Sequence, residues 1–73
     1  MLPQISGREL IKILCKFGFI AVRQKGSHIR LEKKTSEKMI KLTVFVHSKL
    51  KKGTLLRIIK DSEINEEEIS KYF

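Results

Sequence analysis

The sequence predicts an α+β fold in which a helix, a three-stranded antiparallel sheet and a second helix follow one another (α-β-β-β-α), with a short helical tail at the C-terminus. Apolar residues recur at helical spacing near both ends of the chain. Between them lie two segments in which apolar and polar residues alternate, as in strands with one face under helices and one in water. Because 73 residues leave no room for a second domain, we expect residues 1–73 to form one.

The first helix is expected from about Gly7 to Phe17. Ser6 and Glu9 have the spacing of a capping box, in which each side chain accepts a hydrogen bond from a backbone N–H of the first turn. The apolar residues that follow keep helical spacing: Leu10, Ile13, Leu14 and Phe17. Gly18 is a natural end for this helix.

Three strands are expected next. The first covers Phe19 to Gln24 and leads into a tight turn at Lys25 and Gly26. The second is the alternating segment from His28 to Glu32, followed by a polar turn from Lys34 to Lys38. The third has apolar residues that alternate with others: Ile40, Leu42, Val44 and Val46 with Lys41, Thr43, Phe45 and His47.

The pairing of the second and third strands follows from their alternation, because directly opposed residues share a face of the sheet. The pairs that bury the apolar residues are Ile29 with Val44 and Leu31 with Leu42, which brings Glu32 opposite Lys41, His28 opposite Phe45 and Gly26 opposite His47. A slip by two residues would oppose His28 to His47. In either register both histidines lie on the open face, away from the helices.

A basic connector is expected from Ser48 to Lys52, and the second helix from Thr54 to Ser62. The residues of this helix expected to face inward are Leu55, Ile58 and Ile59. Asn65 is placed to cap a last short helical turn, in which the acids Glu66 to Glu68 complement the positive end of the helix.

The charge of the chain suits a polyanionic partner. Its formal net charge is +8 and its pI about 9.9. The charge is uneven: residues 1–60 hold fifteen Lys or Arg against three acids, a net charge of +12, and residues 61–73 have a net charge of −4. This balance favours nucleic acid as the partner, ahead of an acidic membrane or an acidic protein.

Several classes of protein are disfavoured by the sequence. Cys15 is the one cysteine, so no internal disulfide forms; we expect it to be buried, and no zinc-type spacing connects it to a histidine. No secretory leader, membrane-length apolar run, P-loop or dinucleotide turn is visible in the sequence, and Ser27 has no acid-oriented histidine beside it in sequence, as a serine hydrolase triad would need. We expect a cytoplasmic protein without cofactor, metal or membrane contact.

The segment Lys25-Gly26-Ser27-His28 is the first candidate for chemistry. Glycine lets a ligand approach the backbone, and an exposed histidine can both take up and release a proton at neutral pH. RNA cleavage needs a base for the 2′-hydroxyl and an acid for the leaving 5′-oxygen. By residue pattern alone, an exposed strand histidine is more often an ordinary surface residue.

Three further features have alternative interpretations. His47 is either a partner acid, base or phosphate contact, or a residue that stabilises a strand end. The lysines before the second helix, at 49, 51 and 52, oppose the helix macrodipole, which favours phosphate binding over a solvated run. Phe45, with the neighbouring cations Arg30 and Lys41, and with Arg23 if it shares that face, either stacks on an unpaired base or packs against the turn or a partner protein.

The chain resembles the HicA family of mRNA-cleaving toxins. The similarity is carried first by Ser6–Leu14, Gly18–Phe19 and Val22–His28, and then by Val44, Val46–His47 and Leu50–Leu55. It extends from about Ser6 to Ile64. Phe45 is a departure, since the family commonly has proline there.

The resemblance implies a fold like that of double-stranded RNA-binding domains and translation-independent mRNA cleavage, with His28 as the catalytic residue. It also implies a HicB-type antitoxin as partner. The residues expected to contact RNA are Lys25, Gly26, Ser27, Arg30, Lys41, His47, Lys49, Lys51 and Lys52. The rival hypotheses are a non-catalytic module for double-stranded RNA, and a basic subunit whose main partner is an acidic protein.

Overall fold

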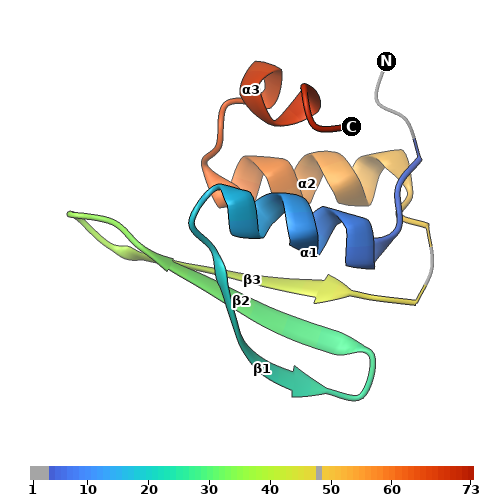
Figure 1. Cartoon of the computed structure of the whole chain (residues 1–73), viewed down its shortest axis with the longest axis horizontal. Coiled ribbons are helices and arrows are strands. Elements are labelled where there is room, and N and C mark those ends of the chain that lie inside the picture. Colours follow the sequence, from blue (N-terminus) through green and yellow to red (C-terminus); the bar gives the residue numbers. More distant parts are fainter. Residues whose placement is uncertain (1–3, 48) are drawn as a thin grey trace.

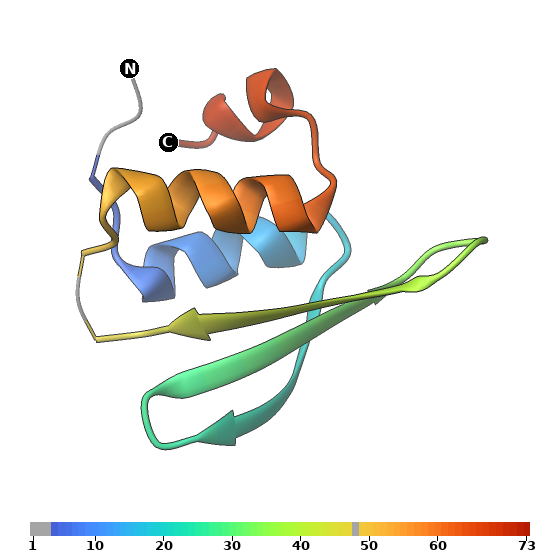
Figure 2. The same cartoon turned by 180° about the vertical axis from the view of Figure 1, so that it is seen from behind.

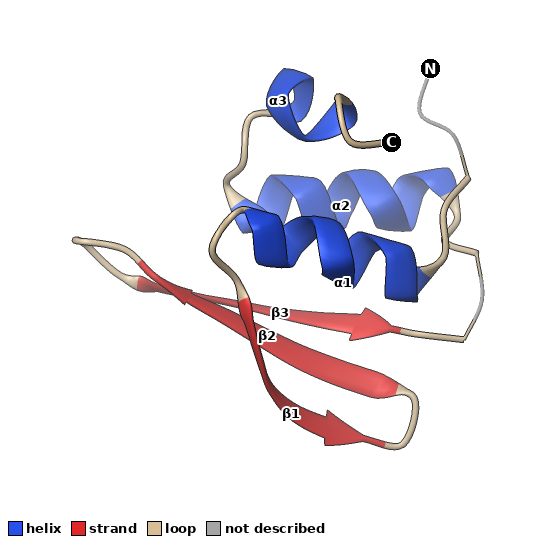
Figure 3. Cartoon of the chain, in the orientation of Figure 1, coloured by secondary structure: helices blue, strands red, loops and turns tan. Residues whose placement is uncertain are grey.

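Two helices, α1 (Gly7–Lys16) and α2 (Lys52–Ser62), lie side by side over one face of an antiparallel sheet (Figure 1). The sheet consists of β1 (Ile20–Lys25), β2 (His28–Lys34) and β3 (Met39–Phe45), in that spatial order. A short helix, α3 (Glu66–Ser70), lies on the outer side of the helix layer. The structure is a computed structural model that describes residues 4–47 and 49–73. The predicted α+β class and order of elements are confirmed (Figure 3).

The capping box predicted at the start of α1 is confirmed. The Ser6 hydroxyl accepts a hydrogen bond from the Glu9 N–H at 3.1 Å, and the Glu9 carboxylate accepts one from the Ser6 N–H at 2.9 Å. The helix ends at Lys16, and Gly18 follows with a φ of 98°, a conformation that favours glycine.

The expectation that Cys15 is buried is wrong, because its side chain is exposed. The buried residues of α1 are Gly7, Leu10, Ile13 and Leu14, which form one stripe at helical spacing. Cys15 follows Leu14 by one residue, about 100° around the helix. It therefore lies outside the stripe, next to Lys16 in sequence.

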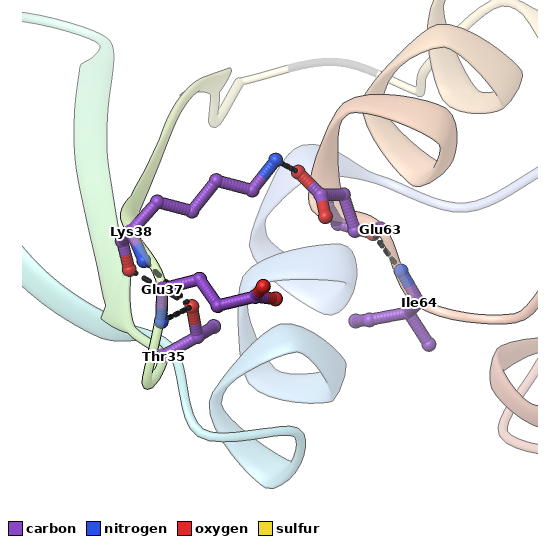
Figure 4. A network of polar contacts seen from close by, with 6 residues as sticks. Thr35, Glu37, Lys38, Glu63 and Ile64 are labelled. Carbon is purple, nitrogen blue, oxygen red and sulfur yellow. Dashed lines mark hydrogen bonds and ion pairs between the residues drawn. The ribbon is translucent and has the colours of Figure 1, made fainter.

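The register predicted for the second hairpin is confirmed: Ile29 opposes Val44, Leu31 opposes Leu42, and Glu32 opposes Lys41. At the turn between them, β2 continues two residues beyond its predicted end and β3 begins one residue before its predicted start. Thr35 organises this turn. Its hydroxyl accepts hydrogen bonds from the Glu37 and Lys38 N–H groups at 3.2 and 3.0 Å (Figure 4). Lys38 also forms an ion pair with Glu63, which connects this turn to the end of α2.

The strand β1 contains an irregularity that the sequence did not predict. Ala21 opposes Leu31 and Arg23 opposes Arg30, so Val22 is an extra residue, a β-bulge. The bulge changes which face each residue of β1 occupies. Ile20 therefore lies on the open face opposite Glu32, and Phe19 before it is buried in the core.

The core lies between the helix layer and the sheet. The residues that are fully buried include Leu10, Leu14, Leu31, Val44, Leu55 and Ile69. Ile29 was expected to be buried and is half-buried. On its β1 side it opposes Gln24, and all six residues of β1 are exposed, so the helices do not cover this edge of the sheet (Figure 2).

The helix α2 begins at Lys52, two residues earlier than predicted, with Lys51 as a cap residue that makes no side-chain hydrogen bond. The predicted connector is described from Lys49, and Ser48 lies outside the described residues. The cap predicted for α3 is confirmed, because the Asn65 side chain accepts hydrogen bonds from Glu67 and Glu68. No helix within residues 4–47 and 49–73 has the length and apolar character needed to cross a membrane.

Candidate nucleic-acid interface

The face of the sheet turned away from the helices presents its side chains in rows, three of which cross all three strands. Lys34 and Met39 form a further pair beyond these rows. The row at the β1–β2 turn consists of Lys25, His28 and Phe45, one residue from each strand. The next row consists of Arg23, Arg30 and Thr43, and the last of Ile20, Glu32 and Lys41. Glu32 is thus the one acid among nine positions, and the open face is strongly cationic around His28.

A two-residue turn, Gly26 and Ser27, determines which residues share the row of His28. Because the turn is so short, Lys25 must oppose His28, and the alternation along β1 then brings Arg23 opposite Arg30. Gly26 has a φ of 58°, which suits glycine. The Ser27 carbonyl accepts a hydrogen bond from the Val46 N–H at 2.9 Å, so the turn is bound to the chain just beyond β3.

Three aromatic rings adjoin one another at this end of the sheet. The ring centroids of His28 and Phe45 are 5.0 Å apart, and those of Phe45 and His47 are 6.0 Å apart. Phe45 therefore lies between the two histidines. All three side chains are exposed, so the predicted placement of both histidines away from the helices agrees with the structure.

The cationic row and the histidine share one shallow depression. It has a volume of about 190 Å³ and is lined by Arg23, Lys25, His28, Arg30 and Thr43. Two guanidinium groups, an ammonium group, an imidazole and a hydroxyl can all act as hydrogen-bond donors. No carboxylate lines the depression, so it offers a site for an anion such as a phosphate.

Gly7 supports the site from the other side of the sheet. A Cβ at this position would lie 1.8 Å from the Phe45 carbonyl oxygen and 3.1 Å from the Val46 Cα. Only glycine lets α1 approach the backbone of β3 so closely. The first turn of α1 thus fixes the strand end that presents Phe45 and, two residues later, His47.

The remaining predicted RNA contacts lie outside the depression and outside the row of His28. Lys41 lies opposite Glu32, two rows away from His28 on the open face. Lys49 pairs with Ser6 at the start of α1, and Lys51 and Lys52 are the cap and first residue of α2. These three lysines follow β3 on the connector that rises to the helix layer (Figure 1). The pKa of Glu9 is lowered mainly by its hydrogen bonds with Ser6. The positive charges of Lys49 and Lys12 lower this pKa further.

Two residues of the depression were not among the predicted contacts. The sequence pattern indicates Arg23 only as a neighbour of Phe45 and gives Thr43 no role in binding. The signal for Arg23 was available, because a two-residue turn at Gly26 and Ser27 fixes its face. Within residues 4–47 and 49–73, no three or more His, Cys, Asp or Glu side chains form a group that could hold a metal ion.

Comparison with known protein families gives a match. A family model described as the HicA toxin of bacterial toxin–antitoxin systems matches residues 7–64. No curated protein matches the chain. The matched region begins at the first residue of α1 and ends two residues before α3, so it contains the whole open face and the three connector lysines.

Proposed function

The chain belongs to the HicA toxin family, whose members are toxins of toxin–antitoxin systems, and we propose that it cleaves mRNA as an endoribonuclease with His28 as the catalytic residue. The observation that carries the proposal is the position of His28. It is exposed, and it lies between Phe45 and a depression lined by cations. A phosphate bound there would bring the adjoining ribose next to an imidazole.

The proposed reaction uses a nucleophile that RNA itself supplies. His28 removes the proton from a 2′-hydroxyl, and the 2′-oxygen attacks the neighbouring phosphorus. The bond from phosphorus to the 5′-oxygen breaks, and this oxygen takes up a proton from an acid or from water. The products are a 2′,3′-cyclic phosphate and a 5′-hydroxyl. Lys25 and Arg30 stabilise the negative charge that grows on the phosphoryl oxygens. Because the nucleophile is a ribose hydroxyl, we propose that no metal ion takes part.

Other residues would hold the RNA in place. Gly26 and Ser27 let a strand of RNA approach the turn closely, since Gly26 has no side chain. His47 would contact a phosphate or the leaving group beyond Phe45. Lys41 and the connector lysines Lys49, Lys51 and Lys52 would contact phosphates along the path of the strand.

We propose that the antitoxin is of the HicB type and covers the open face. Family membership implies an antitoxin partner, and the open face carries the residues whose activity it must block. An acidic or hydrogen-bonding surface would complement the cations of this face. The toxin would act in the cytoplasm, where mRNA is translated.

The test is cleavage of RNA by the purified protein in excess EDTA. We expect the unmodified protein to cut and to leave cyclic-phosphate ends. His28→Ala should reduce the rate by ~10²–10⁴-fold, the usual contribution of general acid–base catalysis. Its fold should be retained, because an exposed side chain contributes little to packing.

His47→Ala is the comparison: it removes the other histidine of the aromatic cluster and should lower the rate less than His28→Ala does. Cleavage by His28→Ala at the unmodified rate would disprove the role of His28. If His47→Ala were the inactive variant, the catalytic residue would be His47. A protein that shifts RNA in a gel without cutting it would be the non-catalytic module.

A further inference from the structure

We propose that the open face is built for single-stranded RNA, with one nucleobase stacked on Phe45 and a neighbouring phosphate held by Arg23 and Arg30. This inference rests on the proposed function and specifies its substrate. It assigns Phe45, Arg23 and Thr43 to a binding site in which His28 lies between the base and the phosphate.

The case for a base site begins with the exposure of Phe45. The alternation of β3 turns this ring away from the core, and 41% of its surface is accessible. Its neighbours are the rings of His28 and His47, so it belongs to an aromatic cluster at the surface. Aromatic side chains in such positions bind nucleobases by stacking, and they accept any base because every base has a π-face.

The case for a phosphate site rests on the depression beside His28. At about 190 Å³ it is smaller than the ~300–1,000 Å³ of typical small-molecule pockets. It therefore suits one group of a polymer better than a free metabolite. The planar donors of Arg23 and Arg30 match the oxygens of a phosphate, and the Thr43 hydroxyl adds a further donor.

The two sites are separated by a distance that one nucleotide can span. Phe45 opposes His28, and Arg30 is two residues further along β2, so Phe45 and Arg30 are diagonal neighbours on one face. Such neighbours lie ~7–8 Å apart in an antiparallel sheet. A base on Phe45 and the adjoining phosphate at Arg30 would leave the ribose beside His28, where the proposed chemistry needs it.

This geometry excludes a double helix as the preferred ligand. In duplex RNA the bases are stacked inside, the major groove is too deep and narrow for side chains, and proteins contact mainly phosphates and 2′-hydroxyls. A ring on a sheet surface cannot reach a paired base in this way. The arrangement instead resembles sheets that stack unpaired bases on exposed aromatic residues.

The experiment measures the affinity of the unmodified protein and its variants for short 2′-O-methylated RNAs, single-stranded or duplex. These RNAs lack the nucleophilic hydroxyl and cannot be cut by the proposed route, so binding is measured apart from cleavage. We expect tighter binding of the single strand. Phe45→Ala should weaken it by roughly 5- to 150-fold, the range for loss of one stacked base, and Phe45→Trp should restore it. Tyr72→Ala removes another exposed aromatic ring and serves as control.

The phosphate site is tested by salt dependence. Arg30→Gln and Arg23→Gln should each reduce the slope of log affinity against log salt, and the double variant should reduce it by ~0.7, the contribution of the one phosphate that both arginines hold. Arg57→Gln changes an exposed arginine on α2 by the same charge and should leave the slope unchanged. Duplex binding as tight as single-strand binding would overturn the proposal, as would unchanged affinity in Phe45→Ala. Absence of cleavage of unmethylated RNA would instead reject the proposed function.

Discussion

At the scale of single residues, the candidate site depends on a residue that lies on the opposite side of the sheet from the open face. Gly7 lies against the backbone of Phe45 and Val46, and a Cβ there would overlap the Phe45 carbonyl oxygen. Backbone atoms cannot move aside as a flexible side chain can. Any larger residue at this position must therefore displace either α1 or the end of β3, and with it Phe45.

The first prediction is that Gly7→Ala lowers the free energy of unfolding by about 1–3 kcal/mol, the usual cost of overpacking. Urea denaturation followed by circular dichroism measures this change. Gly53→Ala is the control: Gly53 is also helical, has no atom within 4 Å of an added Cβ, and should gain stability from the higher helix propensity of alanine. Equal stability of Gly7→Ala and the unmodified protein would show that α1 shifts freely.

At the scale of elements, α1 depends on a charged cap. The Ser6 hydrogen bonds hold the pKa of Glu9 below its usual value, so the carboxylate is favoured in the folded state. The stability that this adds is present above the unfolded pKa of glutamate, ~4.3, and is lost as the pH falls through the lower folded pKa.

We therefore predict that Glu9→Gln is less stable than the unmodified protein at pH 7 and that this difference shrinks on acidification. Glutamine keeps a hydrogen-bond acceptor but does not titrate, so its unfolding free energy should not follow the same decline. Urea unfolding between pH 7 and pH 3 measures both curves. Parallel curves over that range would show that the cap charge contributes nothing to folding.

The sequence predicted the second hairpin more accurately than the first, and the reason is physical. Every residue from Ile29 to Leu31 and from Leu42 to Val44 is either clearly apolar or clearly polar, so one register alone buries the apolar set. In β1 the bulge at Val22 breaks the alternation, and the exposed Ile20 and Val22 give no polar signal. The start of α2 was misplaced because Lys51 is not a residue that favours caps.

The candidate site was only partly predictable, because part of it depends on how the three strands pair. The Lys25-Gly26-Ser27-His28 segment predicted the turn to within one residue, since Lys25 belongs to β1 and the turn is Gly26 and Ser27, and it marked the histidine directly. The depression required the pairing across β1, β2 and β3, which brings Arg23 and Thr43 beside Arg30 although they lie far apart in sequence. Thr43 is an ordinary strand residue by type, so only its position gives it a role.

At the scale of the whole molecule, the connector lysines should set RNA affinity without taking part in chemistry. Replacing Lys49, Lys51 and Lys52 with Gln should weaken binding to every RNA sequence alike. The slope of log affinity against log salt should flatten by up to about two if all three contact phosphates. Titrations at several salt concentrations measure this slope, and cleavage at saturating RNA should persist.

The matched control replaces three other exposed lysines, Lys16, Lys60 and Lys71, with Gln and changes the net charge equally. If both triple variants flatten the slope alike, the connector lysines act only through total charge. If the connector variant loses cleavage at saturation, one of its lysines stabilises the transition state.

The placement of α3 has a consequence for how the protein would approach the proposed RNA substrate. This helix carries Glu66, Glu67 and Glu68 and lies on the opposite side of the helix layer from the cationic sheet face (Figure 1). The molecule is therefore an electric dipole. Near a polyanion it experiences a torque that turns the sheet forward and the acidic helix away before contact. A larger share of encounters then begins in the productive orientation, and this advantage weakens as added salt screens the field.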